Sequence, residues 1–398
     1  MVTVTRDPDR YRVLPGEGHE GVVQVVAGGF YGSGTLLYGG RAVLTSAHVI
    51  DDSDSVSVRL DTSEGRLGLP VSRYALHPDH DIDNANHDLA LVWLAAPAPV
   101  FAQRSGLYRE YDELGQEVTL VGYGLTGAGL DGHRPQNSEG PVKHAVGNRF
   151  DTTGDALKAA FGSGISWSPA RDSQLIIDFD DGSDAHDALG MFMGIDDNGI
   201  GEAEGLIAPG DSGGPAFIDD KVAGVTTYAT SLSRNGQSPD ATDELDGSFG
   251  EIAAFQRVSH YQQWIDQSLR MADSNAPSRP EDVETSIREG DDGTQLIYFL
   301  LEFHGERDTP DQWLSVDYAT RDGTATAGED YLAVADTLIL YPGETQAAIA
   351  VEVIGDNEPE PDETFFLDVS NPIGGDFSAG VAKLTGIRTI VDDDGWIA

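Results

Sequence analysis

Short runs of valine, isoleucine, leucine and threonine, each followed by turn-forming residues, recur along this 398-residue chain. Such runs are typical of β-strands, and 48 glycines suit the turns between them. A chain of this length usually forms two or three domains and can bury a substantial core. The pattern therefore predicts an all-β protein with more than one domain.

The charge of the chain limits its partners. It has 24 basic and 68 acidic side chains, a net charge of −44 with histidine neutral. Nucleic acids and anionic membranes are bound by clustered lysine and arginine, so neither is expected as a partner. The absence of cysteine excludes disulfide bonds and thiol chemistry. No stretch approaches the ~20 apolar residues that a membrane span requires.

A change of composition divides the chain. Apolar residues spaced as on one face of a helix predict an amphipathic helix over residues 255–270. The polar, proline-containing stretch over residues 273–280 is typical of a linker. The segment beyond it is more densely acidic than the segment before it. We therefore expect a first domain over residues 1–272 and a second over residues 281–398.

The most informative motif for function is Gly210-Asp211-Ser212-Gly213-Gly214-Pro215. Glycines leave room for a substrate backbone and let neighbouring N–H groups point to one place. Such a place can hold the negative oxygen of a tetrahedral intermediate. A serine hydroxyl becomes an effective nucleophile when a base accepts its proton. The motif therefore predicts nucleophilic catalysis, provided that a histidine and a carboxylate lie beside it.

Candidates for both residues precede the serine. His48 lies in the run Thr45-Ser46-Ala47-His48, and Asp88 begins the apolar run Asp88-Leu89-Ala90-Leu91. The order along the chain is histidine, aspartate, serine. At these motifs the chain resembles the trypsin-like serine proteases of the chymotrypsin fold. It is similar to their cysteine-free bacterial type, because Val49 follows the histidine where a cysteine is common.

The resemblance implies a fold and an activity. The fold would be a two-barrel protease domain closed by a C-terminal helix and followed by a β-sandwich domain. Ser212 would attack the scissile carbonyl, His48 would take its proton, and Asp88 would orient the imidazole. The N–H groups of Gly210 and Ser212 would form the oxyanion hole. The protein would be a secreted serine endopeptidase acting on proteins or peptides, with no cofactor needed for the chemistry.

Several alternatives remain. Gly-x-Ser-x-Gly is also the nucleophile elbow of α/β-hydrolases, but a helix must then follow the serine. Here the runs over residues 216–218 and 222–225 predict a β-hairpin instead. His87 competes with His48 as the base; on a strand it would point away from Asp88. We expect His77 and His80 in a surface loop. The alternative function is a catalytically inactive, protease-like binding or adhesion module.

The resemblance also suggests where substrate binds. Leu206 would lie at the base of the specificity pocket, and Thr227, Tyr228 and Ala229 would line it and pair with the substrate backbone. Because Leu206 carries no charge, we expect an apolar side chain at the residue preceding the scissile bond (P1) rather than lysine or arginine.

Asp211 also has a role in the family, where it pairs with an amine that chain cleavage releases. Arg12-Val13 is a candidate bond for such a cleavage. We expect instead that the N-terminus is not processed and that Asp211 has another partner. In the Asp- and Gly-rich segment over residues 178–204, the spacing does not match an EF-hand. We expect a solvated acidic loop there rather than a calcium site.

The second domain contains five strand-like runs between residues 296 and 369, which predict a β-sandwich. It resembles a Calx-β domain at Asp322-Gly323-Thr324-Ala325, Gly328-Glu329-Asp330-Tyr331, Pro342-Gly343-Glu344, Asp362-Glu363-Thr364-Phe365 and Asp392-Asp393-Asp394. Calcium prefers carboxylate-rich oxygen sites. The resemblance implies a calcium site with these candidate ligands: Glu289, Asp330, Asp356, Glu360, Asp392, Asp393 and Asp394. The alternative is a solvated acidic surface.

Overall fold

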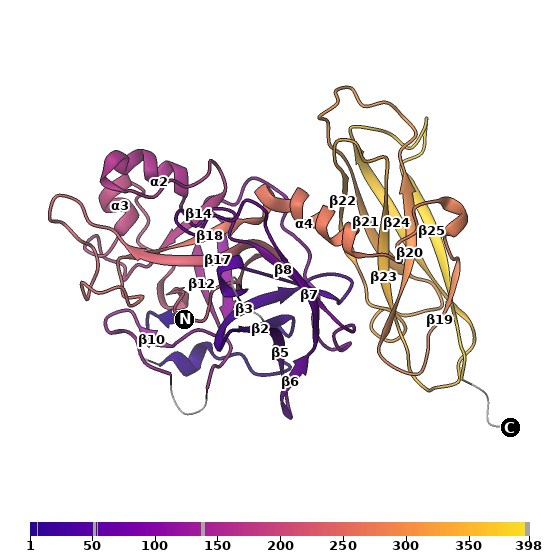
Figure 1. Cartoon of the computed structure of the whole chain (residues 1–398), viewed down its shortest axis with the longest axis horizontal. Helices are drawn as coiled ribbons and strands as arrows, with labels where there is room; N and C mark the ends of the chain where they lie inside the picture. The colour runs from indigo at the N-terminus through magenta and orange to yellow at the C-terminus, as the bar shows by residue number, and fades with distance from the viewer. Residues whose placement is uncertain (6, 51–52, 54, 137–139, 395–398) are drawn as a thin grey trace. The chain divides into compact units, whose positions relative to one another are not determined.

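The computed structural model describes residues 1–5, 7–50, 53, 55–136 and 140–394, and strands dominate it (Figure 1). The chain forms two compact units. The first comprises Met1–Leu37, Arg41–Ala96 and Ala102–Trp264; the second comprises Tyr38–Gly40, Pro97–Phe101 and the chain from Ile265 onward. The division falls inside helix α4 (Val258–Ala272), whereas the sequence predicts it after residue 272. The predicted all-β class is confirmed.

One half of the first unit is a seven-stranded antiparallel sheet in the order β6-β5-β2-β3-β4-β8-β7. Its strands are β2 (Val22–Ala27), β3 (Phe30–Leu36), β4 (Ala42–Thr45), β5 (Val56–Thr62), β6 (Gly65–Leu69), β7 (Val71–Leu76) and β8 (Ala90–Leu94). β4 and β8 are paired and buried, with Thr45 opposite Ala90. The short helix α1 (Ala47–Ile50) follows β4 almost directly.

The other half is a second seven-stranded antiparallel sheet, in the order β12-β9-β16-β17-β18-β14-β13. Its strands are β9 (Glu117–Gly122), β12 (His144–Arg149), β13 (Thr152–Thr153), β14 (Gln174–Asp178), β16 (Pro215–Ile218), β17 (Lys221–Ser231) and β18 (Glu251–Arg257). Strand β16 follows the serine motif and pairs with β17. The predicted hairpin is therefore confirmed, and the helix that an α/β-hydrolase elbow requires is replaced by a strand.

A small four-stranded sheet contains the start of the chain, in the order β11-β10-β1-β15. Its strands are β1 (Val2–Thr3), β10 (Gly127–Ala128), β11 (Gly132–His133) and β15 (Gly205–Leu206). Val2 pairs with Gly127 on one side and with Leu206 on the other. Met1 and Val2 are buried in the same hydrophobic core as Leu206. The first residues are thus an integral part of the second half of this unit.

The predicted amphipathic helix is present as α4. It begins at Val258, because Phe255 and its neighbours up to Arg257 belong to β18. Its apolar face is buried at Val258, Tyr261 and Ile265. The other described helices are short: α2 (Gly154–Phe161), α3 (Ala188–Met193) and the 3₁₀ helices η1 (Pro8–Tyr11), η2 (Gly162–Gly164), η3 (Gly201–Ala203) and η4 (Pro280–Asp282). Within the described residues, no helix has the length and apolar character of a transmembrane segment.

The second unit is a β-sandwich, as predicted. One sheet has the order β19-β25-β24-β21-β22, and the other consists of β20 and β23. The strands are β19 (Ser286–Arg288), β20 (Thr294–Glu302), β21 (Leu314–Asp322), β22 (Ala335–Leu340), β23 (Gln346–Ile354), β24 (Glu363–Ile373) and β25 (Lys383–Val391) (Figure 1). Between the sheets, Phe365 stacks on Tyr331 with ring centroids 4.6 Å apart and contacts Phe299 edge-on. Burial of such aromatic side chains contributes about 1.5–3 kcal/mol each to stability.

Candidate active site

His48 and Asp88 lie side by side. His48 comes shortly after the end of β4, and Asp88 comes shortly before the start of β8. His48 is in α1, and Asp88 precedes β8 by two residues. The His48 Nδ1 atom is 2.7 Å from Asp88 Oδ2, and the His48 backbone N–H donates to Asp88 Oδ1 at 2.9 Å. The Asp88 residue is 1% exposed, whereas the His48 side chain is 30% exposed. The carboxylate is therefore fixed in the interior, and the imidazole remains accessible.

Asp88 sets the tautomer and basicity of His48. An ionised carboxylate only accepts hydrogen bonds, so Nδ1 carries the proton and Nε2 is the acceptor in the neutral ring. Burial lowers the pKa of His48, but the hydrogen bond and the charge of Asp88 outweigh it and raise that pKa above the usual 6.5. The arrangement suits a base that accepts a proton at Nε2.

The serine loop packs against the segment that leads into His48. Ser33 N–H donates to the carbonyl of Ser212 at 2.7 Å, and Gly213 N–H donates to the carbonyl of Thr226 at 2.8 Å. Gly213 has a φ of +80°, and a Cβ atom there would lie 2.1 Å from Thr45 Oγ1. Only glycine permits this approach. The structure thus brings Ser212 next to residues that immediately precede His48.

The peptide groups around Gly210 have defined directions. The Pro209 carbonyl accepts from Leu125 N–H at 2.9 Å, and the Asp211 carbonyl accepts from Gly214 N–H at 2.8 Å. In a trans peptide, C=O and N–H point in opposite directions. The N–H groups of Gly210 and Ser212, which share those two peptides, therefore point away from these donors. Gly210 has a φ of +100°, which glycine tolerates.

Asp211 is fully buried and binds the amino group of Met1. The Met1 ammonium lies 3.0 Å from Asp211 Oδ2. The same carboxylate accepts from Gly124 N–H at 2.7 Å and from Ala208 N–H at 2.9 Å. The partner of Asp211, which the sequence did not identify, is therefore the amine of Met1. Val13 is not that partner, because its N–H donates to the Lys143 carbonyl.

The predicted substrate-binding residues lie in two places. Leu206 is fully buried, and its side chain belongs to the hydrophobic core. Thr227, Tyr228 and Ala229 lie on β17, where a bulge follows Thr226. Tyr228 donates from its hydroxyl to Gln174 Oε1 at 3.1 Å. The three β17 residues are thus held by the second sheet of the first unit, whereas Leu206 lies in the small sheet.

The histidines near Asp88 differ from expectation. His80 was expected in a surface loop, but its side chain is 9% exposed and its Nδ1 lies 3.9 Å from Asp88 Oδ1. His77 is half-buried and stacks on His87, with centroids 4.9 Å apart, and burial lowers the pKa of His77 to about 4. His87 hydrogen-bonds the Tyr261 hydroxyl and lies before β8 with a φ of +53°, not on a strand as expected. No spacing rule links His80 to Asp88, so the sequence carried no signal for this neighbour.

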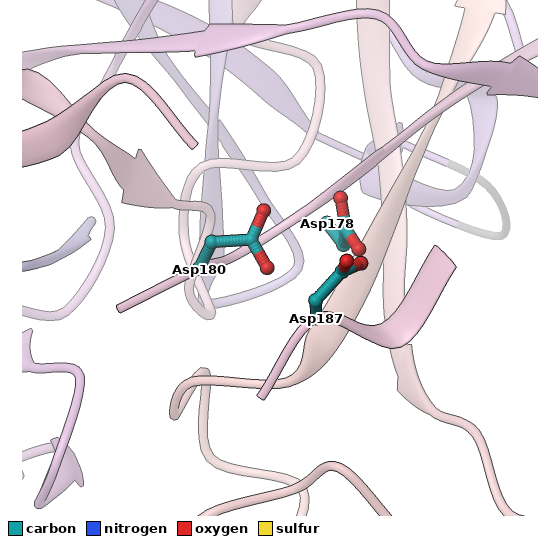
Figure 2. A group of neighbouring side chains, drawn as sticks. All are labelled: Asp178, Asp180 and Asp187. Carbon is teal, nitrogen blue, oxygen red and sulfur yellow. The ribbon is translucent and has the colours of Figure 1, made fainter. Parts of the chain in front are cut away.

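An acidic group in the first unit also contradicts a prediction. Asp178, Asp180 and Asp187 are buried, although the sequence predicts a solvated loop (Figure 2). Burial and the neighbouring carboxylates raise the pKa of Asp180 and of Asp178. The prediction was wrong for these residues because tertiary packing, which the sequence pattern does not reveal, covers them.

The candidate metal ligands of the second unit fall into two groups. Glu289, Asp356 and Asp394 form one, and Asp330, Glu360 and Glu363 form the other. Burial and nearby carboxylates raise the pKa of Glu289 to about 7. The sequence missed Glu363, although it lies in the motif Asp362-Glu363-Thr364-Phe365.

Asp392 and Asp393 lie close to these groups through the backbone. Asp392 accepts a hydrogen bond from Glu360 N–H, and Asp393 accepts one from Gly290 N–H, both at 3.1 Å. Five of the seven predicted ligands therefore belong to the two acidic groups, and the other two accept hydrogen bonds from backbone N–H groups at or next to members of these groups.

Two stretches of the chain match known families. Residues 15–151 match the Trypsin family, and residues 290–394 match the Calx-beta domain family. The first stretch is therefore similar to trypsin-like serine proteases, and the second is similar to Calx-beta domains. The Trypsin match includes His48 and Asp88 and ends before Ser212. The role of Ser212 as the nucleophile is therefore supported by the serine loop and not by the family match.

Individual known proteins are similar to parts of the chain. Sodium/calcium exchanger 2 of Mus musculus is 33% identical over 153 residues, which is 32% of this chain and 17% of the exchanger. Vitamin K-dependent protein C of Rattus norvegicus is 33% identical over 95 residues, 21% of each chain. A solved structure of mouse neuropsin, a serine protease, covers 65% of this chain and 98% of its own, at 18% identity and a TM-score of 0.45. The chain spans only about a fifth of either curated relative.

The contact between His48 and Asp88 leads to a testable prediction about the pKa of the His48 imidazole. In wild type, the His48 ring should titrate above 6.5, because Asp88 stabilises the imidazolium. Asp88→Asn removes that charge while burial remains, so the pKa of His48 should fall below the wild-type value. Nuclear magnetic resonance titration of labelled histidine rings measures both values. Asp79→Asn, at an exposed carboxylate, should leave the His48 titration unchanged. A wild-type ring that titrates at or below 6.5 would contradict the role given to Asp88.

Proposed function

We propose that this chain is a secreted bacterial serine endopeptidase that hydrolyses peptide bonds with His48, Asp88 and Ser212. The observation that carries the proposal is the contact between an accessible imidazole and a buried carboxylate, 2.7 Å apart, beside the glycine-rich serine loop. The trypsin-like domain supports protein substrates. Secretion and a bacterial source rest on the sequence resemblance alone.

The first half of the reaction is acylation. The Ser212 Oγ atom attacks the scissile carbonyl carbon while His48 Nε2 takes the hydroxyl proton. The carbonyl oxygen becomes negative and is stabilised by the N–H groups of Gly210 and Ser212. His48 then gives its proton to the leaving amine, and an acyl-serine ester remains. Asp88 stabilises the imidazolium during this step.

The second half of the reaction is deacylation. Water attacks the ester carbonyl, and His48 Nε2 takes a proton from that water. When the tetrahedral intermediate collapses, the proton returns to Ser212 Oγ and the acid product leaves. Because the base must be neutral, activity falls as the pH drops through the pKa of His48, which lies above 6.5.

Reactivity of Ser212 tests the central proposal. A fluorophosphonate should label wild type but not Ser212→Ala, because labelling requires an activated hydroxyl. Peptide hydrolysis by Ser212→Ala should fall by a factor on the order of 10⁶. Ser238→Ala, at an exposed serine, is the matched control and should keep both properties.

Absence of labelling in a folded wild-type protein would favour the alternative, a protease-like binding or adhesion module without catalysis. Equal labelling of wild type and Ser212→Ala would place the reactive group elsewhere. Circular dichroism of each variant establishes that it is folded.

We propose an apolar preference at P1. Leu206, Ile207 and Ala208 precede the serine loop and are buried and uncharged, so no carboxylate from this segment would attract a basic side chain. Thr227, Tyr228 and Ala229 would lie alongside the substrate backbone. Short peptides that differ only at P1 should give a kcat/KM at least about tenfold higher for leucine or phenylalanine than for arginine. A clear preference for lysine or arginine would refute this.

We propose that the Calx-beta domain binds calcium through the acidic groups around Glu289 and Asp330. Three features support this: clustered carboxylates, burial of Glu289, and similarity to proteins named sodium/calcium exchangers. A cation would relieve the repulsion among these carboxylates. The proposed hydrolysis of peptide bonds by Ser212 does not itself need a metal. The domain would then stabilise the enzyme, make it respond to calcium, or attach it to another structure.

Calcium should raise the thermal unfolding temperature of the full chain. Calcium at about 100 times its dissociation constant stabilises the bound state by about 2.7 kcal/mol. Glu289→Gln should reduce the shift, because it removes a buried carboxylate from one group. Asp311→Asn, at an exposed carboxylate outside both groups, should keep it. Differential scanning calorimetry measures the shift, and an unchanged transition in millimolar calcium would remove the proposal.

A further inference from the structure

Asp178, Asp180 and Asp187 form a compact acidic group in the protease domain. Asp178 ends β14, Asp180 follows two residues later, and Asp187 caps the start of α3. The three residues are 3%, 4% and 5% exposed. One carboxylate oxygen of each lies within 4.8 Å of the others. Figure 2 shows the Asp180 carboxylate directed toward those of Asp178 and Asp187.

Two of these carboxylates are held in place by backbone donors. Asp178 Oδ2 accepts from Leu189 N–H at 2.7 Å, and Asp187 Oδ1 accepts from Gly190 N–H at 2.5 Å. Asp180 is different. Its Oδ1 atom is buried, and no described residue donates a hydrogen bond to it. Asp180 is therefore more than nine-tenths buried and faces two fixed carboxylates, and its Oδ1 atom accepts no hydrogen bond from the described residues.

The charges around Asp180 increase the cost of this arrangement. The groups that act on it most strongly are Asp178, Glu204 and Asp187, all of them acidic. Arg149, whose charge acts on Glu204, is bound to Asp197 and Glu117. An ionised carboxylate in the interior is stable only when it is paired or coordinates a metal. A cation at the centre of the group would satisfy Asp180 Oδ1 and offset the repulsion.

We propose that Asp178, Asp180 and Asp187 bind a calcium ion. Calcium takes six to eight oxygen ligands at about 2.3–2.6 Å, so oxygens on opposite sides of the ion lie about 5 Å apart. The spacing of the three oxygens agrees with that limit. Magnesium keeps several waters and uses one or two carboxylates. Three buried carboxylates therefore favour calcium, with backbone carbonyls or water completing the shell.

The position of the site links it to the serine loop. Glu204 accepts from Asp180 N–H at 2.8 Å and from Ile200 N–H at 2.7 Å. Strand β15 follows Glu204 immediately, and the serine motif begins at Gly210. A bound ion would thus hold the segment that leads into this loop. Any effect on catalysis rests on the proposed function, whereas binding of the ion does not.

The test must separate this site from the acidic groups of the Calx-beta domain. Hydrogen–deuterium exchange with mass spectrometry does so, because it reports each segment of the full chain. The Ser212→Ala protein prevents self-digestion and makes the result independent of activity. Exchange is compared in chelator, in millimolar calcium and in millimolar magnesium. Calcium should slow exchange in peptides that cover residues 178–206, and magnesium should not.

Two variants in the Ser212→Ala background sharpen the test. Asp180→Asn removes the charge that lacks a donor and should weaken the calcium response of this segment at least about tenfold in calcium concentration. Glu202→Gln removes an exposed charge from the same acidic segment and should leave the response unchanged. In chelator, Asp180→Asn should be at least as stable toward urea as its parent, because it removes repulsion. A purely structural role for Asp180 predicts the opposite.

Three results would overturn the proposal. The first is the absence of calcium-dependent protection over residues 178–206 in the parent protein, which decides the matter even if Asp180→Asn fails to fold. The second is the same calcium response in Asp180→Asn as in the parent. The third is an equal response to magnesium, which would overturn the assignment to calcium.

Discussion

The buried carboxylate of Asp211 holds together the segments around the serine loop. It accepts hydrogen bonds from Gly124 and Ala208 and forms an ion pair with the Met1 ammonium. Both charges are almost completely removed from solvent. A buried charge that loses its partner typically destabilises a protein by about 3–5 kcal/mol. The small sheet that contains β1 and the conformation of the loop beside His48 therefore depend on the same contact.

Local patterns predicted much of this fold. Short apolar runs between turn-forming residues indicated the strands of the sandwich, and apolar residues spaced as on one face of a helix indicated α4. The hairpin after the serine motif followed from a turn between two short apolar runs. His48 and Asp88 were predicted from short motifs, and their contact at 2.7 Å agrees with that prediction. These features depend on neighbours along the chain, which a sequence displays directly.

Other features depend on packing between distant segments, and the sequence could not show them. The approach of His80 to Asp88 results from the path of a loop, and the pairing of Asp211 with Met1 joins residues far apart in the chain. The segment with Asp178 and Asp180 looks solvated because it is rich in aspartate and glycine. Its burial follows from the strands and the helix around it, and composition carries no information about that enclosure.

The contact of the first amino group with the interior has a practical consequence for anyone who expresses this chain. A purification tag fused ahead of Met1 would convert its ammonium into an uncharged amide beside the buried carboxylate of Asp211. A tag that follows the last strand, β25, would leave that group intact. The choice of which end to label thus decides whether the chain under study keeps the buried ion pair of Asp211.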